Sequence, residues 1–304
     1  MIQNNMKFKL INVVRIILLN LLLFFIIINV LPNNTKIEIR YALFSKFVNR
    51  EQFLERKSFL IHDNSDFSNS YVLNKYKVKT SDTLLSILSK FNNFKKSSNN
   101  NNFSNNLTIN ITNVMDGRGF CSDYSQVFIA LCNLNKYPVC EISNLNHTFN
   151  EIYDSKKKSF YFIDILNKII AKDKQGNYLS TIEIKDKLMN NEIIEIFKFN
   201  NKKNIYSTND HIATNYFSKD YFKTLILTNN KNVLDFDRKY YPYNFLPIEL
   251  TQIIYAFHNY PLFLILDEHN SFSTRVLKMR FYIFTFLCLY LFVNFYIFKR
   301  LLYK

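Results

Sequence analysis

Glycine is scarce in this chain, with three residues in 304. Two of them, Gly117 and Gly119, stand just before Cys121 in the stretch GRGFCSDYSQVFIALC. Glycine is the usual residue where the backbone needs a positive φ or where another group must approach closely. The placement of two scarce glycines here predicts a turn of special geometry in front of Cys121.

Cysteine is also sparse, and the four residues form no Cys-x-x-Cys pair: Cys121, Cys132, Cys140 and Cys288. This number is too small for a disulfide scaffold, and the spacing does not suggest zinc. Cys132 and Cys140 could form a disulfide in an oxidising compartment. We favour the simpler interpretation that both are buried thiols.

The net charge of +15 and the pI near 9.5 would suit a protein that binds nucleic acid or anionic lipid. The lysines are scattered, however, and the sequence contains no basic helix and no aromatic-basic RNA-binding motif. Recurring Asn and Lys runs indicate a compositional bias, so we interpret the charge as a solvated surface. Nucleic acid is therefore not an expected partner. The alternative of a basic protein that binds nucleic acid or a lipid surface rests on net charge alone.

Two apolar runs are long enough to cross a bilayer. The first, residues 16–31, lies in a predicted span over 10–31, and the second covers 281–298. An 18-residue helix rises about 27 Å, close to the thickness of the hydrocarbon core of about 30 Å. The first run could be a cleaved signal peptide, but no small-residue cleavage site follows it. We therefore expect two transmembrane helices in contact with the lipid bilayer.

Basic residues predict the orientation of these spans. Lys7, Lys9 and Arg15 precede the first span, and Lys299, Arg300 and Lys304 follow the second. By the positive-inside rule, the termini 1–9 and 299–304 lie in the cytoplasm and the region between the spans lies outside it. Three basic residues before the second span weaken this assignment: Arg275, Lys278 and Arg280.

The region between the spans divides into three parts by pattern. Residues 33–106 form a helical N-terminal part with an Asn-rich loop, and 41–60 show helical apolar spacing within it. Residues 107–173 are the candidate catalytic core. Residues 174–274 form a C-terminal part with helical spacing at 181–196.

The apolar residues of 126–134 follow helical spacing, which places Cys121 near the start of a helix. Unpaired N–H groups and the helix dipole lower the pKa of a thiol at this position and make it nucleophilic. Gly119 would adopt a positive φ and leave open space for a substrate carbonyl. A buried cysteine at an ordinary turn explains this segment equally well by itself.

Residues 147–154 and 159–165 read as two strands of a hairpin. A two-residue loop puts His147 opposite Asp164, whereas a four-residue loop puts Phe149 opposite Asp164 and His147 diagonal to it. In both registers His147 and Asp164 share one face. If the Cys121 helix covers this sheet, the three residues provide the nucleophile, base and orienting acid of thiol acyl transfer.

Three blocks of sequence together resemble the transglutaminase-like superfamily of Cys-His-Asp thiol enzymes: GRGFCSDYSQVFIAL, HTFNEIYD and FYFIDI. The resemblance covers about 107–173. It implies an α+β fold with a papain-like core, in which the helix bearing the cysteine packs on an antiparallel sheet. It also implies that Cys121 is the nucleophile, His147 the general base and acid, and Asp164 the residue that orients His147.

The sequence departs from the family pattern at three points. Phe149 stands where Trp is common, Ile165 follows the acid where Pro is frequent, and no side-chain oxyanion donor is found upstream of Cys121. Gly119, Tyr124 and Phe149 are expected to shape substrate access and positioning. The calcium sites found in part of the family would need acidic clusters, and none is present. We expect neither a bound metal nor a cofactor.

These features predict a membrane-anchored thiol acyltransferase or amidohydrolase outside the cytoplasm. Its substrate would be a protein, peptide or cell-envelope amide, and the sequence does not separate protease, amidase and transamidase. The alternative is a catalytically inactive binding or assembly module on the same fold. An intact Cys-His-Asp set argues against it, because binding does not need all three residues.

Overall fold

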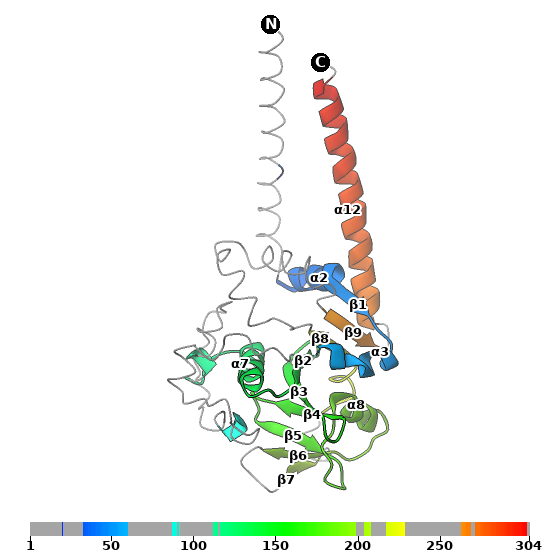
Figure 1. The fold of residues 1–304 in the computed structure, drawn as a ribbon. Coiled ribbons are helices and arrows are strands. Elements are labelled where there is room, and N and C mark those ends of the chain that lie inside the picture. The colour runs from blue at the N-terminus through cyan, green and yellow to red at the C-terminus, as the bar shows by residue number, and fades with distance from the viewer. Residues whose placement is uncertain are drawn as a thin grey trace. The chain divides into compact units, whose positions relative to one another are not determined.

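The computed structural model describes residues 20, 33–59, 87–89, 91, 112–114, 116–198, 204–207, 217–228, 263–268 and 271–302. The chain divides into two units, a terminal unit (Met1–Phe44 with Asn270–Lys304) and a globular unit (Ser45–His269). The fold is α+β (Figure 1). Apart from Asn20, the predicted first span lies outside the described residues.

The globular unit is built on a mixed sheet with nine strands in the order β1-β9-β8-β2-β3-β4-β5-β6-β7. All neighbouring pairs are antiparallel except β1 and β9. The strands are β1 (Ser45–Phe47), β2 (Val139–Ser143), β3 (Thr148–Asp154), β4 (Ser159–Asp164), β5 (Ile169–Lys172), β6 (Glu195–Lys198), β7 (Asn204–Ser207), β8 (Thr224–Thr228) and β9 (Phe263–Asp267).

The β3–β4 hairpin has the longer of the two predicted loops. Asp154 pairs with Ser159 and Asn150 pairs with Ile163, which leaves a four-residue turn over 155–158. Lys158 closes this turn with a φ of 54°. Extending the register puts Phe149 opposite Asp164 and His147 diagonal to it.

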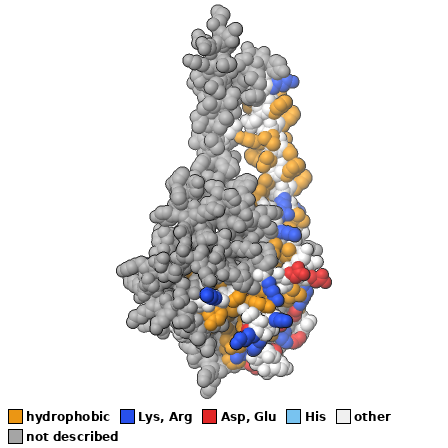
Figure 2. All heavy atoms as spheres, in the orientation of Figure 1, with side chains coloured by type: hydrophobic (Ala, Val, Ile, Leu, Met, Phe, Trp, Pro, Cys, Tyr) orange, Lys and Arg blue, Asp and Glu red, His pale blue; other side chains and the backbone are white. Residues whose placement is uncertain are grey.

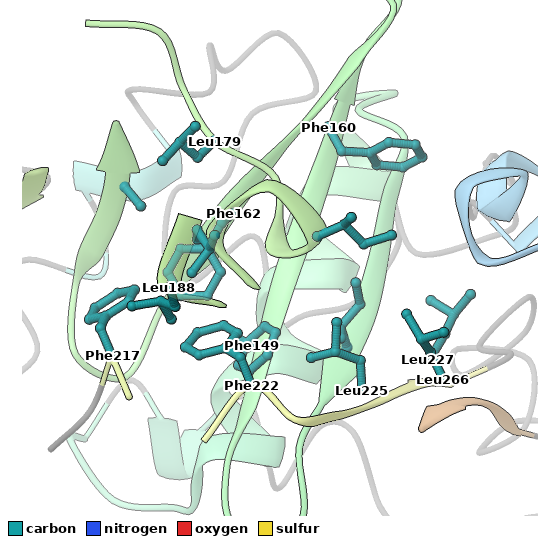
Figure 3. Close-up of a cluster of buried hydrophobic side chains, with 14 of the residues drawn as sticks. Phe149, Phe160, Phe162, Leu179, Leu188, Phe217, Phe222, Leu225, Leu227 and Leu266 are labelled. Atoms are coloured by element: carbon teal, nitrogen blue, oxygen red, sulfur yellow. The ribbon is translucent and has the colours of Figure 1, made fainter. Parts of the chain in front are cut away.

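Helices cover both faces of the sheet. Helix α7 (Cys121–Leu134) packs on one face, where its apolar side chains meet Ile152 and Ile163. Helices α3 (Arg50–Leu54) and α8 (Thr181–Met189) pack on the other. That second face carries an aromatic cluster in which Phe149 and Phe162 lie close together (Figure 3).

Helix α7 covers the sheet, as predicted, but on the face opposite to that of His147 and Asp164. Side chains alternate along a strand, so Asp164 shares the face of Phe162, and His147 follows the alternation of Phe149. This is the face of α8, not of α7. Cys121 meets His147 at the end of β3 instead, since His147 immediately precedes that strand.

Two predicted helices are shorter than their apolar spacing suggested. Helix α2 (Asn33–Phe44) gives way to β1, and α3 then starts at a capping box in which Asn49 accepts the Gln52 N–H at 2.8 Å. The short 3-10 helix η1 (Arg56–Phe59) follows. The helix predicted over 181–196 ends at Met189, because the chain turns and continues as β6 beside β5.

The terminal unit contains α12 (Ser271–Leu302), which includes the predicted second span. Within it, Phe272–Ile297 is long and apolar enough to cross a membrane. Most of its large apolar side chains are exposed, and they form an apolar column along the helix (Figure 2). Arg280 Nε donates to the Ala42 carbonyl at 2.8 Å, which joins α12 to α2.

Candidate active site

The turn before Cys121 has the special geometry that its two glycines predicted. Gly117 and Gly119 have φ values of 76° and 116°, so the expected positive φ is confirmed. The expected open space at Gly119 is wrong, because a Cβ there would lie 3.2 Å from the Asp123 side chain and 3.5 Å from Val114. The glycine lets Asp123 fold back and accept the Phe120 N–H at 2.7 Å, which caps α7.

Cys121 is the first residue of α7 and is only partly buried. Burial by itself raises the pKa of the thiol. A hydrogen bond from His147, the positive charge of that ring, and hydrogen bonds from the Thr148 backbone and hydroxyl outweigh this effect and leave the pKa below its ordinary value. The site therefore favours a thiolate.

His147 is held between the thiol and a buried acid. Its Nε2 lies 2.8 Å from Asp164 Oδ2, which leaves Nδ1 to face Cys121. Burial lowers the pKa of the ring, but the hydrogen bonds and charges of Asp164 and Cys121 raise it to about 9. Each shift favours the charged form of its group, an imidazolium at His147 and a thiolate at Cys121.

The Asp164 carboxylate is also held by Asn167. The Asn167 N–H donates to Asp164 Oδ1 at 3.0 Å, and Asn167 Nδ2 donates to Asp164 Oδ2 at 2.7 Å. Asn167 thus contributes to the orientation of both acid oxygens. Asn167 was not among the predicted site residues, although an acid at a strand end that accepts N–H groups of the following turn is a known local motif.

A second asparagine, Asn144, holds the backbone of His147. Its Oδ1 accepts the N–H groups of Asn146 and His147 at 2.8 and 2.6 Å. Its Nδ2 donates to the Tyr221 carbonyl at 2.9 Å. Asn144 is buried, so these bonds fix the turn between β2 and β3 and attach it to the segment before β8.

We expect Asn144→Ala to slow iodoacetamide alkylation of Cys121 roughly three- to tenfold at about pH 6, because His147 loses its backbone anchor. Asn144→Asp keeps the acceptor oxygen and should restore most of the rate. Position-resolved mass spectrometry of the alkylated protein measures both. An alanine variant with the wild-type rate and the wild-type pH profile would show that Asn144 only stabilises the turn.

Tyr124 and Phe149 are both buried in the core, so neither side chain is exposed to a substrate, and their part in substrate positioning stays a prediction. Tyr124 belongs to α7 and packs in the core cluster between this helix and the sheet. The Phe149 ring lies 6.3 Å from the His147 ring and 5.2 Å from the Phe162 ring, so it supports the imidazole from below. Aromatic support of His147 is a packing role and does not require contact with substrate.

Tyr221 is a member of the site that the sequence pattern did not reveal. The pKa of its phenol is raised to about 12, chiefly by burial. A hydrogen bond from Asn144 lowers this pKa, and the negative charges of Asp164 and Cys121 raise it. The phenol therefore stays protonated beside the dyad of Cys121 and His147. Its segment has no periodic pattern, and only the tertiary fold brings it near.

The other thiols differ from Cys121. Cys132 and Cys140 are free and buried, so the prediction of two buried thiols is confirmed. Burial raises the pKa of both far above that of an exposed thiol. Cys288 is free and lies exposed on α12.

No protein-family model, curated protein or solved structure matches this chain. The resemblance to the transglutaminase-like superfamily therefore remains a prediction.

Proposed function

We propose that the chain is a membrane-anchored thiol enzyme of transglutaminase-like type that cleaves or transfers amide bonds through an acyl-enzyme on Cys121. One observation carries the proposal. Cys121, at a helix start, is hydrogen-bonded to His147, whose other nitrogen lies 2.8 Å from the buried Asp164 carboxylate. Nucleophile, base and orienting acid in this order are the arrangement that thiol acyl transfer requires.

The first half-reaction forms a thioester. The Cys121 thiolate attacks the carbonyl carbon of the amide, the C–N bond breaks, and the His147 imidazolium gives its proton to the leaving amine. Asp164 keeps the ring oriented and stabilises its positive charge. The first N–H groups of a helix have no intrahelical acceptor, so the Cys121 N–H can donate to the developing oxyanion.

The second half-reaction releases the acyl group. Water or an amine attacks the thioester carbon while neutral His147 takes its proton, and the C–S bond breaks to restore the thiolate and imidazolium. Water gives a carboxylic acid, and an amine gives a new amide. The substrates we propose are protein, peptide or cell-envelope amides.

Membrane anchoring is supported by α12 and by one contact in the terminal unit. Asn20 Nδ2 donates to Asn294 Oδ1 at 2.9 Å, which favours a first span beside the second. A hydrogen bond between polar side chains is a recognised contact between transmembrane helices. With basic residues at both outer ends of the spans, the globular unit would lie outside the cytoplasm.

Turnover by single-site variants of the full-length protein tests this function. With a library of peptide amides and amine release as the readout, we expect Cys121→Ser and His147→Ala to lose roughly a thousandfold or more of the activity. Cys288→Ser, on the apolar helix, should keep it. Retained activity in both site variants would contradict the proposal. A wild-type protein that turns over no amide would favour the alternative, a catalytically inactive binding module on the same fold.

A further inference from the structure

Three large apolar side chains are exposed among the described residues of the globular unit, and two of them adjoin the dyad. Phe120 is 45% exposed and directly precedes Cys121, and Leu145 is 46% exposed and lies just before His147 in the β2–β3 turn. The third is Leu54, on α3, which is 48% exposed. Because Cys121 and His147 are hydrogen-bonded, Phe120 and Leu145 flank the dyad along the chain, one directly before α7 and the other in the β2–β3 turn.

Folding gives no reason for Phe120 to be aromatic. It is the N-cap of α7, where Ser, Thr, Asp and Asn are strongly preferred because their side chains accept a helix N–H. Phe120 makes no such bond, and the capping interaction at this helix comes from Asp123 instead. The exposed ring therefore contributes neither a cap nor core packing.

Leu145 is equally unexplained by the fold. The turn between β2 and β3 is held by the Asn144 side chain, which accepts the N–H groups of Asn146 and His147. A polar residue at the Leu145 position would suit such an exposed turn at least as well. Exposed apolar groups that gather at one place on a soluble unit commonly mark a binding surface.

The charged residues nearest along the chain do not favour a charged ligand. Arg118 Nη2 lies 2.7 Å from Asp116 Oδ2, so these two side chains neutralise each other. Asp123 is buried and engaged with the Phe120 N–H. The charged side chains nearest to Cys121 along the chain are therefore neutralised or buried.

We infer that Phe120 and Leu145 bind an apolar group of the acyl donor. The site then selects amides whose acyl part carries a large apolar side chain next to the scissile carbonyl. Covering two exposed apolar side chains with a third removes apolar surface from water, which supplies binding energy beside the reacting carbon. The inference rests on the proposed function, since it assumes that Cys121 is acylated.

Two alkylating probes that differ in one side chain test the inference on the full-length protein. They are N-acetylphenylalanyl and N-acetylglycyl chloromethyl ketone, from which the thiolate displaces chloride to form a thioether. We expect the phenylalanyl probe to label Cys121 at least roughly tenfold faster than the glycyl probe. Phe120→Ser with Leu145→Ser should reduce this ratio to about threefold or less, whereas the matched control Leu54→Ser should preserve it.

Iodoacetamide labelling of the wild type distinguishes a failure of the inference from a failure of the proposed function. Equal rates for the two ketones together with fast iodoacetamide labelling overturn the inference and leave the proposed function standing. Slow iodoacetamide labelling overturns the proposed function and the inference with it. A preference that survives in the double variant shows that other residues bind the side chain. The single variants give the same test if the double variant is unstable, and Phe120→Ser places a favourable residue at the N-cap.

Discussion

Arg56→Met should lower the free energy of unfolding of the globular unit by about 3–5 kcal/mol. Arg56 and Glu151 are 1% and 0% exposed, and Arg56 Nε lies 2.6 Å from Glu151 Oε2. The other carboxylate oxygen of Glu151 accepts the Thr181 N–H at 2.6 Å. Without Arg56, a buried carboxylate loses its counter-charge in a site that water cannot reach.

Two further variants test this explanation, each measured by denaturant unfolding of the full-length protein. Arg56→Met with Glu151→Gln removes the stranded charge and keeps an acceptor for the Thr181 N–H, so it should recover at least half of the loss. Arg50→Met removes a guanidinium that pairs with Asp186 while 42% exposed, and it should cost about 1 kcal/mol or less. Equal losses for Arg56→Met and Arg50→Met would contradict the account of the buried pair.

His147→Ala should slow iodoacetamide alkylation of Cys121 by roughly 10- to 100-fold at about pH 6. In the wild type, His147 lowers the pKa of the Cys121 thiol by a hydrogen bond and by its charge. Without it, burial raises the pKa and the stabilising partner is gone. An ordinary thiol with a pKa of about 8.5 is less than about 1% ionised at this pH.

The same pair determines the pH dependence of the reaction. The wild-type rate should rise with pH through the lowered pKa of Cys121 and then stay level as long as His147 is protonated, up to a pH of about 9. In His147→Ala, the rate should keep rising through the alkaline range, as for an isolated thiol. A wild-type profile that matches that of the variant would show that the two residues do not form an ion pair. Label on Cys132 or Cys140 reports unfolding, because both are buried.

The candidate site could be predicted from the sequence where local rules apply. Strand alternation places His147 and Asp164 on one face whether the hairpin loop has two or four residues. In the structure the two side chains are in contact. The sequence does not decide between the two-residue and the four-residue loop, because residues 155–158 are all polar and suit both turns. The positive φ of Gly119 followed from residue type, whereas its crowded surroundings depend on Asp123 and Val114.

Local rules could not predict which residues from distant parts of the chain reach the site. Tyr221 reaches the dyad because β8 pairs with β2, and no local pattern indicates that pairing. No local pattern indicates β1 either, because its three residues pair with β9 more than two hundred positions later in the chain. This strand interrupts the helical apolar spacing of residues 41–60. Cys121 was placed at a helix start by spacing, but the face of the sheet that α7 covers depends on tertiary packing.

The most direct test of the central claim is acylation of Cys121 itself. The full-length protein is mixed with p-nitrophenyl acetate, and nitrophenolate release is followed while mass spectrometry locates the acetyl group. We predict a rapid burst of about one equivalent per chain, an acetyl thioester on Cys121, and loss of both in His147→Ala. Acetylation confined to lysines, with no burst and an unmodified Cys121, would contradict the claim that this thiol is an acyl-transfer nucleophile.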